Sequence, residues 1–342
     1  MGTPIGDLVL KEEISLDFLN GRKVGVDAYN IIYQFLSSIR GPDGTPLMDS
    51  NRNITSHLTG LLYRTTNLFE RGIKPVFVFD GAPHKLKEKT IESRIKTRTD
   101  AKVEHEKALR EGNLEKAKKF GSRALHLTEE MVKQSKELLQ LMGLPVVQAP
   151  SDGEAQIAFM TQKGFVEGCV SQDYDSLLFG APIIYRNIAV SGKRKVHGKN
   201  IYIDVSPEKI DLQKTLDALK ISREKLVWLA MLVGTDFNEK IPKVGPKSAL
   251  ELVQKHDSFE EILKEKEVEI EFDFKEVQDI FLKPKFLDDF KIEFKQPQKE
   301  KVMEFLCEKH DFSRDRVENA LAKLEQKAKE KGEQSRLDAW FG

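Results

Sequence analysis

Carboxylate side chains recur in short pairs between residues 149 and 179. The first pair, Asp152 and Glu154, follows a β-branched apolar run at 145–148, and the second, Asp173 and Asp175, follows a similar run at 166–170. Both runs are typical of buried parallel strands, and residues 153–162 between them are typical of a helix. Ligands of open parallel sheets bind at the carboxyl ends of the strands. Four acids gathered there would repel one another unless cations lay among them, so the pattern favours a site for hard divalent ions such as Mg²⁺.

Two earlier segments repeat the order of a strand followed by an acid. Residues 22–27 predict a buried strand that ends at Asp27, and residues 74–80 predict another that ends at Asp80. A single Asp after a strand is more often a turn former, and Asp152 alone could simply cap its helix. Recurrence on three strands favours a shared acidic site instead. Asp236, which follows an apolar helix at 226–233, would be a seventh carboxylate.

Residues 85–123 are rich in lysine and arginine and poor in large apolar residues. The composition favours helix, but a helix with so little to bury should project from the body or cover a groove. Lys87 and Arg94 are seven residues apart and would face the same way. The stretch is either a solvated charged helix or a phosphate-binding arch. Its position beside Asp80 favours the arch, whose cations would offset the charge of a polyanionic substrate.

A second basic element is the turn at 241–247, which leads into a helix from Ser248. Backbone N–H groups at a helix start form a ready anion site, and Lys243 and Lys247 flank it. By itself such a Gly-Pro turn says little about function.

The polar segment 332–342 contains Leu337, Trp340 and Phe341, which would share one face of a one-turn helix. Adjacent aromatic residues at a polar terminus would be exposed unless something buries them. Docking onto the protein's own body is one reading, but the polar lead-in with its glycine favours a tethered partner motif.

Composition sets the remaining bounds. A chain of 342 residues suits one large domain or about two ordinary ones, and its 55 basic and 55 acidic side chains cancel, so only local charge can indicate a nucleic-acid partner. Cys169 and Cys307 both lie in apolar sequence and provide no disulfide framework, which implies a reducing interior. The start lacks a signal-peptide core and no apolar run is long enough to span a membrane. We therefore expect a soluble intracellular protein without a membrane partner.

The motifs and their order resemble the flap endonuclease family, structure-specific 5′ nucleases of replication and repair, and its archaeal branch in particular. The resemblance extends over essentially the whole chain. It is carried by the Met-Gly-x-Pro-Ile-Gly start and by residues 26–28, 32–36, 78–81, 149–155, 171–175 and 234–236. The end of the chain directly after the terminal motif also resembles archaeal members.

The fold that this resemblance implies is α/β, with a mostly parallel central sheet flanked by helices (a PIN-like 5′ nuclease fold), a helical arch and a helix-two-turn-helix element. It divides the chain into one nuclease domain at 1–331 and a sliding-clamp-binding tail at 332–342. Within the domain we expect an N-terminal part at 1–100, the arch at about 82–127, an internal part at about 128–260 and a helical C-terminal part at 261–331.

The resemblance also implies a role for each residue of the site. The metal-site acids are Asp27, Asp80, Asp152, Glu154, Asp173, Asp175 and Asp236, with two Mg²⁺ ions for which Mn²⁺ can substitute. Lys87 and Arg94 match the arch residues that contact the scissile phosphate, and with Asp27, Asp80, Glu154 and Asp173 they form the expected catalytic set. Tyr33 matches the aromatic that stacks on a base, and Lys243, Gly245 and Lys247 match the turn that grips the duplex, in some members with a monovalent cation. Gln334, Leu337, Trp340 and Phe341 match the anchors of the clamp-binding peptide.

Two positions depart from the family pattern. Asp152 stands where the family usually has Glu, so its contact with a metal would be shorter or pass through water. Lys243 replaces a usual Gly at the turn that would coordinate the monovalent cation.

The implied function is hydrolysis of DNA at single-strand/double-strand junctions, as a 5′ flap endonuclease and 5′–3′ exonuclease with a two-metal mechanism. The expected role is Okazaki-fragment maturation and repair in the cytoplasm or nucleoid of an archaeon. The expected partners of this monomer are branched DNA with a 5′ flap and the sliding clamp, which stimulates it. Alternatives are a related gap or exonuclease, an RNA-directed nuclease of the same superfamily, and a non-catalytic clamp-bound DNA adaptor. The adaptor would give no reason for seven converging acids.

Overall fold

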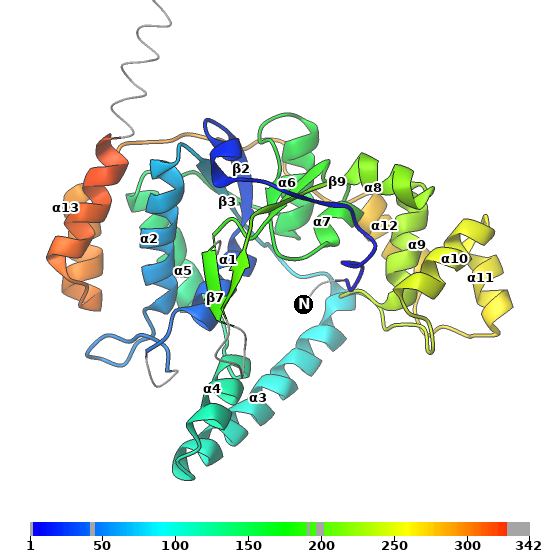
Figure 1. The fold of residues 1–342 in the computed structure, drawn as a ribbon, viewed down its shortest axis with the longest axis horizontal. Helices are drawn as coiled ribbons and strands as arrows, with labels where there is room; N and C mark the ends of the chain where they lie inside the picture. Colours follow the sequence, from blue (N-terminus) through cyan, green and yellow to red (C-terminus); the bar gives the residue numbers. More distant parts are fainter. Residues whose placement is uncertain (1–2, 42–44, 190–191, 196–201, 327–342) are drawn as a thin grey trace, which may run out of the picture.

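A seven-stranded sheet forms the centre of the computed structural model, which describes residues 3–41, 45–189, 192–195 and 202–326 (Figure 1). The strand order is β1-β9-β6-β5-β2-β3-β4. The strands are β1 (Lys11–Glu13), β2 (Lys23–Asp27), β3 (Lys74–Phe79), β4 (Val146–Gln148), β5 (Cys169–Val170), β6 (Ile183–Arg186) and β9 (Glu208–Asp211).

Five neighbouring strands of this sheet, from β6 to β4, run parallel. In their register Val26 of β2 pairs with Phe77 of β3 and with Val170 of β5, so these strands end at nearly the same level. Strand β9 runs antiparallel to β6, and β1 runs antiparallel to β9. The prediction of a mostly parallel α/β sheet is therefore confirmed, with an antiparallel edge in addition.

Helices cover both faces of the sheet, and the residues of β3 show why. Val76 and Val78 belong to one buried apolar cluster and Phe77 and Phe79 to the other, because successive side chains of a strand point to opposite faces. One cluster includes α6 (Gly153–Gln162), α7 (Asp175–Leu178) and α9 (Arg223–Val233). The other includes α1 (Ala28–Ser38), α2 (Ser56–Glu70) and α5 (Glu129–Leu141).

A helical hairpin projects from this body after β3 (Figure 1). The short helix η2 (Lys85–Lys87) leads into α3 (Glu88–Arg110), which is followed by α4 (Leu114–Arg123). Gly112, at φ +67°, allows the tight reversal between them. The buried apolar residues at the contact include the small side chains of Ala101, Ala108 and Ala117. The expected projection of this charged segment is thus confirmed.

The remaining helices extend the helical layers on the two faces of the sheet (Figure 1). Near α9 lie α8 (Leu212–Leu219), α10 (Pro246–Lys255), α11 (Phe259–Lys266) and α12 (Phe274–Leu282), while α13 (Lys299–Met303), η3 (Glu304–Glu308) and a helical segment at 314–326 lie beside α2. A two-stranded ribbon consists of β7 (Gly192–Lys195) and β8 (Tyr202–Val205).

The segment 283–298 connects the helices on one face of the sheet to those on the other and contains no regular helix or strand. It is tied to the end of α5 because the N–H of Lys295 donates to the carbonyl of Gly143 at 2.8 Å and the N–H of Gln298 to that of Leu141 at 2.8 Å. A Cβ at Gly143 would lie 2.1 Å from the carbonyl oxygen of Lys295, so this crossing requires glycine. None of the described helices is both long and apolar enough to cross a bilayer.

Candidate active site

Six of the seven predicted carboxylates lie where a parallel strand gives way to a loop or helix. Asp27 ends β2, Asp80 follows β3, Asp152 and Glu154 follow β4, and Asp173 and Asp175 follow β5. The seventh, Asp236, lies just beyond the end of α9. Because these strands are neighbours in parallel register, the acids meet at one edge of the sheet.

Burial and mutual repulsion act together on these acids. Burial raises the pKa of Asp27 well above its usual value, and the charges of Asp80 and Asp173 raise it further. Burial raises the pKa of Asp173 to about 6, with the charge of Asp175 next in importance. The pKa of Asp80 also rises to about 6, mainly through burial. For Glu154 and Asp175 burial is again the main cause of a raised pKa. Each acid is thus within electrostatic reach of several others.

Two cations from the base of the helical hairpin reach into this cluster. The ammonium of Lys87 pairs with Asp152, and Nη2 of Arg94 lies 2.6 Å from Oδ1 of Asp236. Burial opposes the charge on Lys87, but Asp152 and the other nearby acids outweigh it and raise the pKa of Lys87. Asp152 occupies the N-cap position of α6 without making a capping hydrogen bond. The alternative that the Asp152 side chain simply caps the helix is therefore wrong, because this carboxylate pairs with Lys87 instead.

The other five acids are held by hydrogen bonds from neutral groups, each through one of its two oxygens. Among the described residues, no hydrogen-bond donor contacts the second oxygen of any of these five acids. The first oxygens accept as follows: Asp27 Oδ1 from the N–H of Asn30 (3.0 Å), Asp80 Oδ1 from the N–H of Gly153 (2.7 Å), Glu154 Oε1 from the hydroxyls of Ser171 (2.7 Å) and Ser176 (2.8 Å), Asp173 Oδ2 from Nδ2 of Asn30 (2.9 Å), and Asp175 Oδ1 from the N–H (2.9 Å) and hydroxyl (2.6 Å) of Thr3.

These donors were not singled out from the sequence. A local signal exists for Asn30, which lies one turn after Asp27, whereas Ser171 and Ser176 flank the second acid pair but donate to Glu154. Thr3 has no such signal, because 172 residues separate it from Asp175.

Tyr33, the predicted base-stacking residue, lies on α1 near the hairpin. The guanidinium of Arg98 on α3 is 5.8 Å from the centroid of its ring. A base that stacked on this ring would therefore lie beside the hairpin.

The predicted duplex-binding turn precedes α10. Gly245 is the N-cap of this helix and Pro246 its first residue, while Lys243, Gly245 and Lys247 are exposed. Lys243 has φ +61°, a left-handed conformation that glycine adopts more readily. Gln334, Leu337, Trp340 and Phe341 of the predicted clamp-binding peptide lie outside the described residues.

The donor set fits hard divalent ions. Carboxylate oxygens are the ligands that Mg²⁺ and Mn²⁺ prefer, and buried acids with raised pKa values gain most from a neighbouring cation. Within the described residues, no three acidic, histidine or cysteine side chains form a ready-made metal-ligand group. Two of the seven carboxylates, those of Asp152 and Asp236, are instead turned toward hairpin cations.

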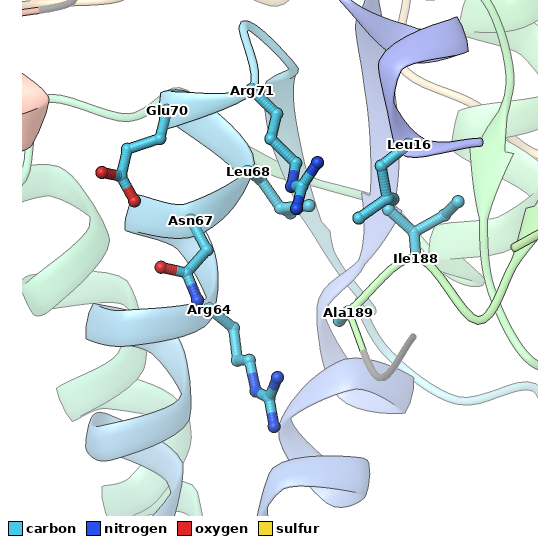
Figure 2. Close-up of a pocket in the computed structure, with 8 residues that line it drawn as sticks. All are labelled: Leu16, Arg64, Asn67, Leu68, Glu70, Arg71, Ile188 and Ala189. Atoms are coloured by element: carbon cyan, nitrogen blue, oxygen red, sulfur yellow. The ribbon is translucent and has the colours of Figure 1, made fainter. Parts of the chain in front are cut away.

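A cavity of about 410 Å³ lies away from the acids, between α2, the short helix η1 (Leu16–Leu19) and residues 188–189 (Figure 2). Figure 2 shows Arg71 extending toward Leu16, whereas the carboxylate of Glu70 points to the other side of α2. The residues lining it include none of the seven acids, so we do not assign the chemistry to this cavity.

Two family models match the regions that contain the acids. The XPG N-terminal domain matches residues 5–101 and the XPG I-region matches residues 143–236. The fold and the acidic edge thus define a metal-dependent nuclease with XPG domains.

Individual relatives narrow this class. The chain is 50% identical to flap endonuclease 1 of Pyrococcus abyssi over 343 residues, covering 100% of this chain and 98% of that protein. It is 50% identical to the Archaeoglobus fulgidus protein of the same name over 341 residues, covering 100% of both. The flap endonuclease-1 structure from Methanococcus jannaschii superposes with a TM-score of 0.78 at 39% identity, covering 96% of this chain and 100% of that one. The catalytic core of Rad2 in complex with DNA substrate gives 0.67 at 27% identity, covering 94% and 97%. The chain belongs to the flap endonuclease family of structure-specific 5′ nucleases.

Proposed function

We propose that the seven acids and the two hairpin cations form one active site, which hydrolyses DNA at single-strand/double-strand junctions as a 5′ flap endonuclease and 5′–3′ exonuclease. The observation that carries this proposal is the contact of Lys87 and Arg94 with Asp152 and Asp236. It brings phosphate-binding side chains to the same place as metal-binding ones. A hydrolase for a phosphodiester needs both kinds of group around one phosphorus atom.

In this proposal two Mg²⁺ ions, or Mn²⁺ as a substitute, would be held by the acids Asp27, Asp80, Asp152, Glu154, Asp173, Asp175 and Asp236. Such ions supply polarisation of the phosphodiester, a lowered pKa of the attacking water and stabilisation of the leaving oxygen. Lys87 and Arg94 move from their carboxylate partners to the phosphoryl oxygens and neutralise the charge that develops there. The water oxygen bonds to phosphorus and gives up a proton to solvent, while the bond between phosphorus and the 3′ oxygen breaks and that oxygen takes up a proton. The products carry a 5′-phosphate and a 3′-hydroxyl.

Substrate selection would come from shape and phosphate contacts rather than from base reading. The helical hairpin would cover the single strand and Tyr33 would stack on a base near the cut. Lys243, Gly245 and Lys247 would bind the duplex backbone, since N–H groups at the start of α10 and two exposed ammonium groups suit phosphates. The backbone of this turn would also bind a monovalent cation. Lys243 adopts the left-handed φ open to glycine, so replacing the usual Gly leaves the backbone path available.

In the cell this activity would serve Okazaki-fragment maturation and repair. The peptide at 334–341 would bind the sliding clamp through Gln334, Leu337, Trp340 and Phe341, and the clamp would stimulate cleavage by a protein that is otherwise a monomer. Because its substrate is branched DNA, the protein would work inside the cell, where that DNA is.

A labelled 5′-flap assay across a magnesium titration tests the proposal, with the cut mapped to the nucleotide. Wild-type protein should cut near the junction only when magnesium is present, and flaps of different sequence should be cut alike. Asp173→Ala should lose cleavage but retain DNA binding. Asp257→Ala is a matched control, because the Asp257 side chain is 97% exposed and its ion pair is with Lys225 of α9, and it should cut as wild type does.

Full activity of Asp173→Ala, or undiminished turnover in excess chelator, would refute the metal-site assignment. A blunt duplex, a gapped duplex and single-stranded RNA belong in the same assay. Preference for one of these over the flap would favour the related exonuclease, gap nuclease or RNA-directed nuclease. DNA binding with no cleavage of any substrate would leave only the clamp-bound adaptor.

A further inference from the structure

Asn30 connects two of the acids that follow neighbouring strands. It lies in the first turn of α1, and its backbone N–H donates to Oδ1 of Asp27 at 3.0 Å. Its side-chain Nδ2 donates to Oδ2 of Asp173, 143 residues away in sequence, at 2.9 Å. One residue therefore sets the orientation of a carboxylate after β2 and of another after β5.

The orientation of the Asn30 amide is determined by a third contact. The N–H of Gln172 donates to Oδ1 of Asn30 at 3.2 Å, so the amide oxygen must face Gln172 and the amide nitrogen must face Asp173. Because Gln172 directly precedes Asp173, this contact also ties the loop after β5 to the start of α1. The bridge thus has a defined direction and no free rotation.

The chemical type of Asn30 suits its place. Asp27 and Asp173 repel each other, as the raised pKa of Asp27 reflects in part. A lysine or arginine at residue 30 would relieve this repulsion but would compete with cations for both carboxylates, as Lys87 and Arg94 do for Asp152 and Asp236. A neutral amide orients Asp173 through one oxygen and adds no charge. The torsion that turns a carboxylate plane is otherwise broad, so orientation without such a donor is poorly defined.

We infer that Asn30 is a positioning residue, which holds Asp27 and Asp173 in one relative orientation so that their second oxygens are presented together to divalent ions. The inference rests on the metal site proposed above. Asn30 would favour ion binding through pre-organisation. Because the carboxylates are already oriented in the free protein, binding of the ions does not have to bear the free-energy cost of orienting them. Removing a residue that orients metal ligands typically lowers metal affinity or activity about 10–100-fold.

Asn30→Ala and Asn30→Leu test the inference. Both keep the backbone N–H that caps α1 through Asp27 and remove only the bridge to Asp173 and Gln172, and leucine nearly matches asparagine in size. Calorimetric titration with Mn²⁺, without DNA, should show about tenfold weaker binding for each variant. In flap cleavage, the magnesium concentration for half-maximal rate should rise by a similar factor. The rate at saturating magnesium should return toward that of wild type, and DNA affinity in chelator should not change.

Asn53→Ala is the matched control. Nδ2 of Asn53 donates to Oδ2 of Asp49 at 3.0 Å and its N–H to Oδ1 at 2.8 Å, which reproduces the amide–carboxylate contact outside the acidic edge. This variant should bind Mn²⁺ as wild type does. Wild-type Mn²⁺ affinity in a folded Asn30→Ala or Asn30→Leu protein would overturn the inference, and so would an equal loss in Asn53→Ala. Failure of the wild-type protein to bind Mn²⁺ would instead refute the metal site itself.

Discussion

Nη2 of Arg94 lies 2.6 Å from Oδ1 of Asp236, and the hydroxyl of Thr90, one turn earlier on α3, donates to the backbone carbonyl of Asp236 at 2.9 Å. The base of the projecting hairpin is thus fastened to the loop that follows α9. A side chain expected to bind phosphate is paired with one expected to bind metal. We therefore expect a phosphate or a divalent ion that enters the site to replace this contact, so that the hairpin and the acids respond to the same ligands.

We predict that Arg94→Ala lowers the single-turnover rate of flap cleavage by roughly 10²–10³-fold, the usual loss when one stabilising donor to a developing anion is removed. Because Asp236 loses its internal partner, the affinity for Mn²⁺ without DNA should rise a few-fold. Rate and metal affinity therefore move in opposite directions. Arg110→Ala serves as the control, since the Arg110 side chain is 82% exposed on the same helix. An unchanged rate in Arg94→Ala would remove this residue from the catalytic set.

The salt dependence of DNA affinity tests the turn before α10. If Lys247 neutralises one phosphate of the duplex, Lys247→Ala should reduce the slope of log affinity against log salt by about 1, equally for all DNA sequences. Fluorescence anisotropy with a flap substrate between about 50 and 200 mM salt, in chelator, measures this slope. Lys275→Ala removes a lysine that is 74% exposed on α12 and should leave the slope unaltered. Parallel curves for wild type and Lys247→Ala would contradict the contact.

Stability should depend on pH through His57 of α2. Its ring is fully buried, Nε2 lies 3.1 Å from Oε1 of Gln134, and Nδ1 has no partner in the described part of the chain. Burial lowers the pKa of His57 to about 4, and the nearby charge of His310 acts in the same direction. An unfolded histidine takes up its proton near pH 6.5, so the unfolded state binds more protons between about pH 6.5 and 4. The contribution of neutral His57 to the free energy of unfolding is therefore complete above about pH 6.5. It is lost as the pH falls through about 4.

Urea unfolding at about pH 7 and 5 measures this effect. The wild-type free energy of unfolding should fall by about 2 kcal/mol more than that of His57→Gln, which cannot titrate but can still donate to Gln134. His126→Gln, at an exposed histidine, should follow the wild-type dependence. If the free energy of unfolding fell equally in wild type and His57→Gln, His57 would bind its proton equally well in the folded and unfolded states.

The terminal peptide is tested by Phe341→Ala. If Phe341 anchors the chain in an apolar pocket of the sliding clamp, its truncation should weaken clamp binding by roughly 10–100-fold, the range for a buried aromatic anchor. Stimulation by the clamp should be lost at the same protein concentration while cleavage without the clamp is unchanged. Ser335→Ala, next to the anchor position Gln334, should keep stimulation. Equal stimulation of wild type and Phe341→Ala would remove the clamp-binding assignment.

Much of this architecture was predictable because its signals are local. The order of a buried apolar run followed by an acid appears at Asp27, Asp80 and Asp173 within a few residues each, and the structure has those strands adjacent and parallel. The charged segment after Asp80 is poor in apolar residues, and it forms a projecting hairpin. Strand period and helix propensity depend on residues that are neighbours in the sequence, so the sequence alone predicts these elements.

The tertiary structure alone decided which side chains meet. Thr3 with Asp175, Asn30 with Asp173 and Arg94 with Asp236 are pairs separated by 172, 143 and 142 residues. Nothing near either partner in the sequence specifies such a contact, because a hydrogen bond depends on where two distant elements pack and on the direction in which each side chain leaves its backbone. The sequence alone determines which acidic, basic and amide side chains are available for chemistry. Which oxygen is held, by which donor, and which is left for a ligand follows from packing across the sheet.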